Sequence, residues 1–350
     1  MEGTDDAKNF ADHDELGGLT VMRCSSYKHV SAKWRSVRVL DFDTMVYMEE
    51  SSKTAATGHE LRGVVLAFLG ATCWGFSATC VSWLTTHAGA DVLWVANLRM
   101  LCTGVVFTLI ALVKCRPQIV HLLHDRKLIM QLFAHAVVGV LIVQISYMYA
   151  IAYTNPPTAL LLQETGVPIV MLIECIRTRR LPTGFEVLAL ALAVFGIVAI
   201  ATQGSFTTLE VNPLGLAWGL CSGAALAGYN IIPVRLLREC GSLTTNGLAM
   251  LIASCVITPF VQPWSNPVPL DGMGLFALFG VVVIGTMVAY GVYLRGVADA
   301  GPVKASLVGV FEPVSGAVFS VIWLGTMLSM WDFAGGAAII AMMIIVALVK

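Results

Sequence analysis

Three ionisable residues, Arg99, Glu164 and Glu312, lie inside long apolar stretches of the sequence. A charge in such a stretch is costly unless it has a partner or faces water, so residues of this kind are often functional. At ~1.5 Å of rise per residue, each lies roughly 10–13 Å from the nearer end of its expected helix. We expect Arg99 to pair with Glu164 or Glu312, and the remaining carboxylate to face a central cavity.

A structural role is the alternative for each of these charges. Arg99 could tie its helix to its neighbours. Glu312 stands directly before Pro313 and could satisfy backbone groups that the proline leaves free. Glu164 could be protonated and simply hydrogen-bonded, but it has no counterpart in the internal repeat described below, which favours a role toward a solute or a proton.

A second set of side chains combines aromatic rings and amides within apolar runs. The members expected to bind a substrate are Trp74, Gln144, Tyr147, Tyr290 and Tyr293. Gln144 and Tyr147 are three residues apart, as are Tyr290 and Tyr293, so each pair shares one face of a helix. Rings with a polar tip suit a cavity that holds organic solutes, and ordinary helix packing is the alternative. Three more side chains of this character are Trp218, Tyr229 and Asn230.

The sequence lacks the patterns of common enzyme sites. It has no GxxxxGK[ST] phosphate loop, no HExxH zinc motif and no GxSxG elbow. We therefore expect no catalytic residue, no metal site and no cofactor. A lone histidine in an apolar run, His135, is expected to be a packing residue. The formal net charge of −1 gives no reason to expect a nucleic-acid partner.

The composition indicates a membrane protein. Hydrophobic residues make up 57 % of the 350 residues and charged residues 12 %, whereas a soluble domain has about 25 % charged residues. Apolar runs of about 20 residues, each long enough to cross ~30 Å of hydrocarbon, follow one another from residue 63. We predict an all-α membrane protein with about ten transmembrane helices. The expected spans are 63–84, 91–113, 129–153, 157–176, 182–202, 213–234, 243–262, 273–297, 303–325 and 331–349.

The positions of Lys and Arg predict how these helices are oriented, because cytoplasmic loops are rich in both. With the N-terminus inside, the inner loops hold groups such as Arg177, Arg179 and Arg180, and the outer loops hold neither Lys nor Arg. We expect a multi-pass protein of the cell (plasma or inner) membrane with both termini in the cytoplasm.

Residues 1–61 precede the first expected span and turn from acidic to basic. They lack the apolar core of a secretory signal. We expect a mostly disordered cytoplasmic extension, and the internal Met22, Met45 and Met48 leave open where the protein begins.

Two parts of the sequence, residues 70–176 and 214–325, resemble each other at an offset of about 145. Trp74-Gly75, for example, matches Trp218-Gly219. Each copy holds five expected helices, and since five is odd, the second copy must cross the membrane in the opposite sense. Inverted repeats are typical of secondary transporters, whose substrate site lies near the midplane between the halves.

The chain resembles the drug/metabolite transporter superfamily, specifically members with two EamA domains. The resemblance covers about residues 62–350 and rests on Gly70-Ala-Thr-Cys-Trp-Gly75, Arg99, Pro168-Ile-Val, and the stretch from Tyr290 through Phe311-Glu312-Pro313-Val314 to Leu324-Gly325. It departs at Thr178 and Thr326, where the family often has Glu. The resemblance implies one EamA-like repeat at 62–202 and an inverted one at 213–350. It also implies a ten-helix permease, usually an exporter of amino acids or other small metabolites.

These observations predict a secondary transporter that exports a small organic solute, such as an amino acid, by alternating access around a midplane cavity. Its partners would be the solute and the lipid bilayer, with or without protons as the coupling ion. The alternative is an intramembrane enzyme, although no nucleophile–base or metal constellation stands at one depth. The identity of the solute and the oligomeric state stay open.

Overall fold

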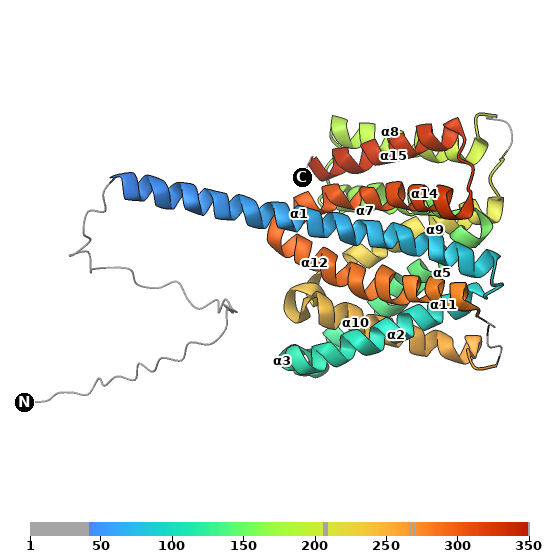
Figure 1. Ribbon diagram of the computed structural model, residues 1–350, viewed down its shortest axis with the longest axis horizontal. Helices are drawn as coiled ribbons and strands as arrows, with labels where there is room; N and C mark the ends of the chain where they lie inside the picture. The colour runs from blue at the N-terminus through green and yellow to red at the C-terminus, as the bar shows by residue number, and fades with distance from the viewer. Residues whose placement is uncertain (1–41, 206–208, 266–267, 269, 349–350) are drawn as a thin grey trace, which may run out of the picture. The chain divides into compact units, whose positions relative to one another are not determined.

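The computed structural model describes residues 42–205, 209–265, 268 and 270–348. The chain divides into two compact units, residues 1–51 and 52–350. In the first unit the described part is helical. Most of the predicted N-terminal extension, residues 1–41, lies outside the described residues, and the rest of it belongs to helix α1. The second unit contains all the expected spans, and Figure 1 shows its helices.

Every regular element in the described residues is helical, so the predicted all-α class is confirmed. The elements of the first half are α1 (Phe42–Thr86), α2 (Val92–Lys114), α3 (Arg116–His124), α4 (Arg126–Ala134), η1 (His135–Leu141), α5 (Ile142–Tyr153), α6 (Pro156–Gln163), α7 (Gly166–Arg177) and α8 (Gly184–Thr202). Those of the second half are α9 (Pro213–Ile231), α10 (Val234–Val261), α11 (Gly272–Phe279), η2 (Gly280–Val288), α12 (Ala289–Ala300), α13 (Pro302–Gly309), α14 (Phe311–Leu324) and α15 (Met330–Leu348).

Nine helical segments in the described part of the chain are long and apolar enough to cross a membrane. Several of them combine consecutive elements, such as α4, η1 and α5. The segments are Glu60–Thr86, Val92–Lys114, Arg126–Tyr153, Pro156–Arg177, Gly184–Thr202, Val234–Val261, Gly272–Ala300, Lys304–Leu324 and Met330–Leu348. They correspond to nine of the ten expected spans.

The tenth expected span, 213–234, corresponds to α9, a helix of 19 residues. It equals α8 and α15 in length but is not among the nine apolar segments. Gly215, Gly219 and Gly223 stand where larger apolar side chains would raise its hydropathy. The reason for these glycines is packing, since small residues let helices approach closely.

The helix α9 lies against α5, α6 and α7 of the first half. A Cβ atom added at Gly219 would lie 2.5 Å from Leu162 Cδ1, and one added at Gly223 would lie 2.1 Å from Thr165 Oγ1. Both distances are far below van der Waals contact. The glycines of α9 are therefore what allows the two halves to meet at this surface.

The helices of the two halves contact each other in matched pairs. In Figure 1, α2 lies beside α10 and α8 lies beside α15, and each pair joins a helix to its own repeat counterpart. The contact of α9 with α6 and α7 also has a counterpart, because α1 approaches α14 closely at Gly75. Such a pattern is that of a pseudo-two-fold arrangement, as two repeats would produce.

The close approach at Gly75 gives a stability prediction. A Cβ atom there would lie 2.5 Å from the Gly316 backbone nitrogen and 2.6 Å from the Glu312 carbonyl oxygen. We expect Gly75→Ala to lose about 1–3 kcal/mol of stability because backbone atoms cannot move aside. The Tm of the purified protein in detergent measures this. Gly291→Ala is the matched control, since nothing lies within 4 Å of a Cβ at that position. Equal Tm values for both variants would contradict the tight contact.

Two π-helical segments interrupt long helices at matched positions. The segment η1 joins α4 to α5, and η2 joins α11 to α12. Their first residues, His135 and Gly280, are separated by the repeat offset of about 145. The π geometry is rare and occurs mostly as short segments, frequently near functional sites. The repeat is therefore visible in the backbone as well as in the sequence.

Two other spans are broken near their middle, again at corresponding places. Glu164 and Thr165 separate α6 from α7, and Val310 separates α13 from α14. At the first break the backbone stays hydrogen-bonded as a tightened turn, since Thr165 N–H donates to the Leu162 carbonyl oxygen over 3.2 Å and Val167 N–H to that of Glu164 over 3.0 Å. In membrane transporters such breaks tend to line the substrate site.

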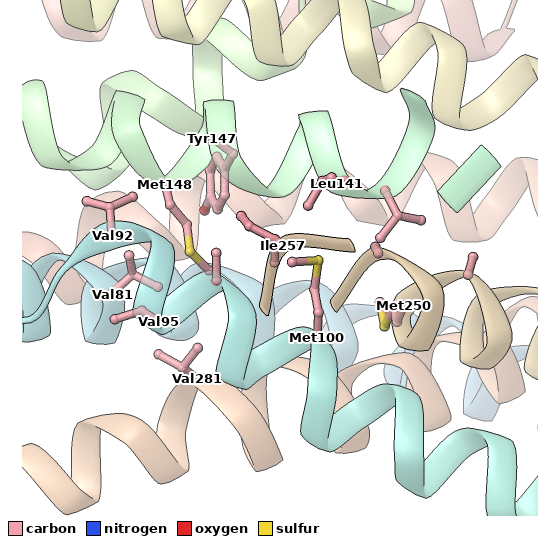
Figure 2. Packing of buried hydrophobic residues seen from close by; sticks show 14 of the residues in the cluster. Val81, Val92, Val95, Met100, Leu141, Tyr147, Met148, Met250, Ile257 and Val281 are labelled. Atoms are coloured by element: carbon pink, nitrogen blue, oxygen red, sulfur yellow. The ribbon is translucent and has the colours of Figure 1, made fainter. Parts of the chain in front are cut away.

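One large cluster of buried apolar side chains in the described residues joins the first four spans of the first half to α10, α11 and η2 of the second, and partly buried Trp218, Tyr229 and Trp323 pack against it. Figure 2 shows part of it, including Met100 of α2, Met148 of α5 and Met250 of α10. A smaller cluster holds α8 against α15, with Ile200 and Ile339 fully buried. The fifth span of each half therefore packs mainly with its counterpart and leaves the other spans to surround the central cavity.

Candidate functional site

A cavity of about 390 Å³ lies between the two halves. All eight side chains that the sequence predicted for substrate binding line it. They come from α1, α2, α5 and the α6–α7 break in the first half, and from α12 and α14 in the second. The eight are Trp74, Arg99, Gln144, Tyr147, Glu164, Tyr290, Tyr293 and Glu312.

The two carboxylates, Glu164 and Glu312, stand at the breaks of their helices. Glu164 directly follows α6, and Glu312 is in the first turn of α14. The N-terminal end of a helix interacts favourably with a negative charge, so the dipole of α14 favours the charged form of Glu312. Among the described residues neither carboxylate has a hydrogen-bonding or ion-pair partner. Both are therefore available to a solute or a proton in the cavity.

Arg99 makes no direct ion pair with either carboxylate in the described structure, and its charge interacts with that of Glu312 only through space. Arg99 is 7 % exposed, and its Nε donates to Thr286 Oγ1 over 2.7 Å. A terminal nitrogen donates to the Gly285 carbonyl oxygen over 3.4 Å. Both acceptors belong to η2, and the Thr286 hydroxyl in turn donates to the Val281 carbonyl oxygen over 2.9 Å. Neutral acceptors thus hold the guanidinium, whose positive charge is not cancelled by a direct ion pair in the described structure.

Aromatic side chains form much of the cavity wall. The ring of Trp74 lies edge-on to Tyr290, with 5.3 Å between centroids, and 4.8 Å from the tilted ring of Tyr293. The Tyr229 hydroxyl donates to Asn246 Oδ1 over 3.1 Å and lies 3.3 Å from the Tyr290 hydroxyl. These contacts fix the rings before any solute arrives.

Two of the three further side chains that the sequence singled out, Tyr229 and Asn230, also line the cavity. The sequence did not single out Gln163, Ser242 and Asn246, which line it as well. Ser242 lies in what the sequence presented as an inner loop, but the structure continues α10 through it. Gly241, with φ of 75°, kinks α10 directly before Ser242, and only glycine adopts this backbone easily. The pair Gly241-Ser242 was the feature of the sequence that could have indicated a kink with a polar side chain beside it.

Two residues that the sequence singled out lie outside the cavity lining. Trp218 stacks on Tyr149 with 5.0 Å between ring centroids. His135 is fully buried at the start of η1, with its ring 5.1 Å from that of Tyr229. Both side chains contribute to packing rather than to the surface of the cavity.

The contact between Arg99 and Thr286 gives a second stability prediction. Thr286→Val removes the hydroxyl that accepts from Arg99 Nε and leaves a buried charged donor without its partner. We expect a loss of about 1–3 kcal/mol, read as a lower Tm in detergent. Thr286→Ser keeps the hydroxyl and should retain most of the stability. Equal Tm values for Thr286→Val and Thr286→Ser would show that this hydrogen bond does not hold α2 to η2.

The cavity extends toward one end of the bundle. Pro233, Leu237 and Ser242, where α9 joins α10, are part of its lining. At the opposite end of α10, the chain that follows this helix is joined to the start of α2, because Trp94 Nε1 donates to the Pro263 carbonyl oxygen over 3.3 Å. The lining of the cavity therefore reaches the end of the bundle that carries the α9–α10 junction.

Known proteins are similar to this chain in both halves. The EamA-like transporter family matches residues 61–202 and 213–348. The uncharacterized inner membrane transporter YicL of Salmonella typhimurium is 27 % identical over 291 residues, which cover 83 % of this chain and 97 % of YicL. The uncharacterized transporter YwfM of Bacillus subtilis is 22 % identical over 46 % of this chain and 53 % of its own length.

A solved structure described only as "Crystal structure of protein" shares the fold, with a TM-score of 0.53. It is 17 % identical and the match covers 82 % of this chain and 98 % of that one.

The two family matches fall one on each repeat and together cover most of the chain. The resemblance seen in the sequence is therefore confirmed, and the chain is a membrane transporter rather than an intramembrane enzyme. It belongs to the EamA-like transporter family.

Proposed function

We propose that the protein transports a small zwitterionic organic solute, of which an amino acid is the simplest, through the cavity between its halves. The observation that supports this is the presence of one guanidinium and two free carboxylates in a single cavity with aromatic walls. They belong to Arg99, Glu164 and Glu312.

A zwitterion would satisfy both signs of charge in the cavity. A guanidinium has five N–H donors, and Arg99 uses two of its nitrogens on Thr286 and Gly285, so donors are left for a solute carboxylate. Glu164 or Glu312 would accept the solute ammonium. A solute with only a negative charge would meet two carboxylates, whereas a solute with only a positive charge would leave Arg99 without a counter-ion.

The same count of charges supports proton coupling. One carboxylate is enough to bind an ammonium group, and the second can take up and release a proton during transport. Ionisable side chains in such a place often serve proton relays in transporters. In this proposal the solute and a proton compete for two neighbouring acidic groups.

The direction of transport in the proposal is export from the cytoplasm. The cavity reaches the α9–α10 junction, and this end of the bundle carries the arginine-rich loops that predict the cytoplasmic side. The relative YicL is described as an inner membrane transporter, which supports the same location here. The arginine-rich loops are the support for both termini in the cytoplasm. Alternating access would then expose the cavity to the opposite face by rocking the two repeats.

Flux measurements on reconstituted protein test this proposal. Liposomes would receive a panel of labelled amino acids, the amines that lack their carboxyl group, and the acids that lack their amino group. We expect flux of amino acids alone, increased by a pH gradient. Equal flux of the amines or of the acids would contradict a zwitterionic substrate, and no response to the gradient would contradict proton coupling.

A further inference from the structure

A second cavity, of about 560 Å³, lies between α7 and α10 beside the proposed solute site, and Asn230 lines both. Side chains of α4 and α9 also contribute to it. Its lining includes Val170, Ile173 and Arg177 of α7 and Val234 and Arg238 of α10. Nothing in the proposed transport of a zwitterion requires this space.

Arginines dominate the charge of this second cavity. Its lining holds Arg177, Arg235 and Arg238 but only one acidic side chain, Glu174. Arg235 is already engaged, since it lies 2.7 Å from Glu239 and 3.0 Å from Asp125. In the described residues Arg177 and Arg238 have no hydrogen-bonding or ion-pair partner. Two guanidiniums are therefore free to bind an anionic group.

Arg235 belongs to a network of ion pairs with Asp125 and Glu239 on this side of the cavity. Asp125, in the loop before α4, accepts from the Lys127 backbone N–H over 2.8 Å. That bond, together with the Arg235 guanidinium, holds the pKa of the Asp125 carboxyl below its usual range. The carboxyl is thus charged at neutral pH and keeps Arg235 in place.

The free arginines lie at the depth of lipid headgroups. Arg177 is the last residue of the apolar segment Pro156–Arg177, and Arg238 is in the second turn of the segment Val234–Val261. At ~1.5 Å per residue, Arg238 lies only about 6 Å from the end of its segment. Both arginines therefore stand near the ends of their apolar segments, where lipid phosphates are expected.

Below the arginines the wall of the cavity is apolar. Val170, Ile173 and Arg177 lie on one face of α7, because they are spaced by three and four residues. On the opposite wall Val234 is 51 % exposed, and Ile173 is 39 % exposed. One face of α7 therefore changes from apolar to cationic toward the end of the helix, as the structure of a phospholipid changes from acyl chain to headgroup.

We propose that this cavity binds an anionic phospholipid. Its phosphate contacts Arg177 and Arg238, and an acyl chain lies along Val170, Ile173 and Val234. Charge complementarity and the apolar wall favour a lipid over a soluble anion, which would have no use for the apolar surface. A bound lipid would bridge α7 of the first half and α10 of the second.

Native mass spectrometry of the detergent-purified protein with added phosphatidylglycerol or phosphatidylcholine tests the proposal. Each arginine near a headgroup contributes roughly fivefold to the affinity for an anionic lipid, so Arg177→Gln/Arg238→Gln should bind phosphatidylglycerol about 30-fold more weakly. Arg126→Gln/Lys127→Gln is the matched control, because it removes the same charge outside the cavity lining. It should bind as the unmodified protein does.

Ile173→Asn provides an independent test, since it changes the apolar wall and leaves every charge in place. We expect it to weaken phosphatidylglycerol binding as well, and we expect soluble glycerol phosphate not to displace the lipid. Equal binding of the two lipids, unchanged affinity in the double arginine variant, or displacement by glycerol phosphate would each overturn the proposal. The Ile173→Asn result decides the matter even if the arginine variant fails to fold.

Discussion

Replacing Glu164 by glutamine is expected to reduce transport by about 30-fold or more, because losing one member of a desolvated charge interaction typically costs 2–5 kcal/mol. The substitution keeps the size of the side chain and removes its ability to take a proton or to pair with an ammonium group. Glu164 has no hydrogen-bonding or ion-pair partner in the described structure, so folding should not depend on its charge. Initial rates of amino acid uptake into liposomes, at equal protein per liposome, measure the effect.

A control removes a carboxylate outside the cavity. Glu60→Gln breaks an exposed ion pair with Lys304, and such surface pairs contribute little. This variant should transport normally. Comparing Glu312→Gln with Glu164→Gln distinguishes the roles of the two carboxylates. The variant that lacks the ammonium-binding carboxylate should lose uptake in all conditions. The variant that lacks the proton-binding carboxylate should lose only the response to a pH gradient. Full transport by Glu164→Gln would exclude Glu164 from the mechanism.

Arg99→Gln is expected to weaken the apparent affinity for amino acids by about 10- to 100-fold, since each hydrogen bond to a charged group contributes about 1.5–3 kcal/mol. The effect should depend on the solute. An amine without a carboxyl group cannot use the guanidinium, so its weak binding should not fall further in the variant. Scintillation proximity binding of labelled amino acid, competed by the matching amine, measures both.

Arg99→Lys distinguishes recognition of the solute from support of the fold. A lysine keeps the charge but lacks the fork geometry of a guanidinium, and so cannot reach Thr286, Gly285 and a carboxylate together. We expect a Tm close to that of Thr286→Val and a marked loss of affinity. If the Tm falls and the affinity stays normal, Arg99 is a structural residue that ties α2 to η2.

The sequence predicted the composition of the central cavity because the cost of burying charge is a local property. Arg99, Glu164 and Glu312 stand out in any apolar run, and the helical spacing of Tyr290 and Tyr293 puts both on one face. Their meeting in one cavity required only that the two repeats pack against each other. The structure shows that they do.

The partner of Arg99 could not be predicted in this way. The two glutamates were the acidic residues expected at a similar depth in the membrane, but the acceptors are a hydroxyl and a carbonyl of η2. A π turn has no signature in hydrophobic periodicity, and the stretch Gly280–Val288 reads as an ordinary apolar helix. The prediction considered only charged partners. The guanidinium of Arg99 instead donates to a neutral hydroxyl and a backbone carbonyl, and such groups are too common in a sequence to be singled out.

The helix α9 shows a similar limit in the count of spans. Its glycines serve contacts at 219 and 223 with another helix, and the same glycines lower the hydropathy by which a span is recognised. Surface that faces protein does not need to be apolar in the way that surface facing lipid does. In α9, hydropathy therefore underestimates a helix whose glycine face packs against protein.

The matched π segments also bear on the ancestry of the chain. Two separate insertions of so rare a feature at His135 and Gly280 are less economical than one insertion inherited by both halves. A single origin places the π segment in an ancestor of half this length, before the gene was duplicated. In that ancestor the contacts of α2 with α10 and of α8 with α15 would have joined identical chains across a dimer axis. On this account the backbone arrangement that the halves share is older than the arginines in which they differ, such as Arg177, Arg235 and Arg238.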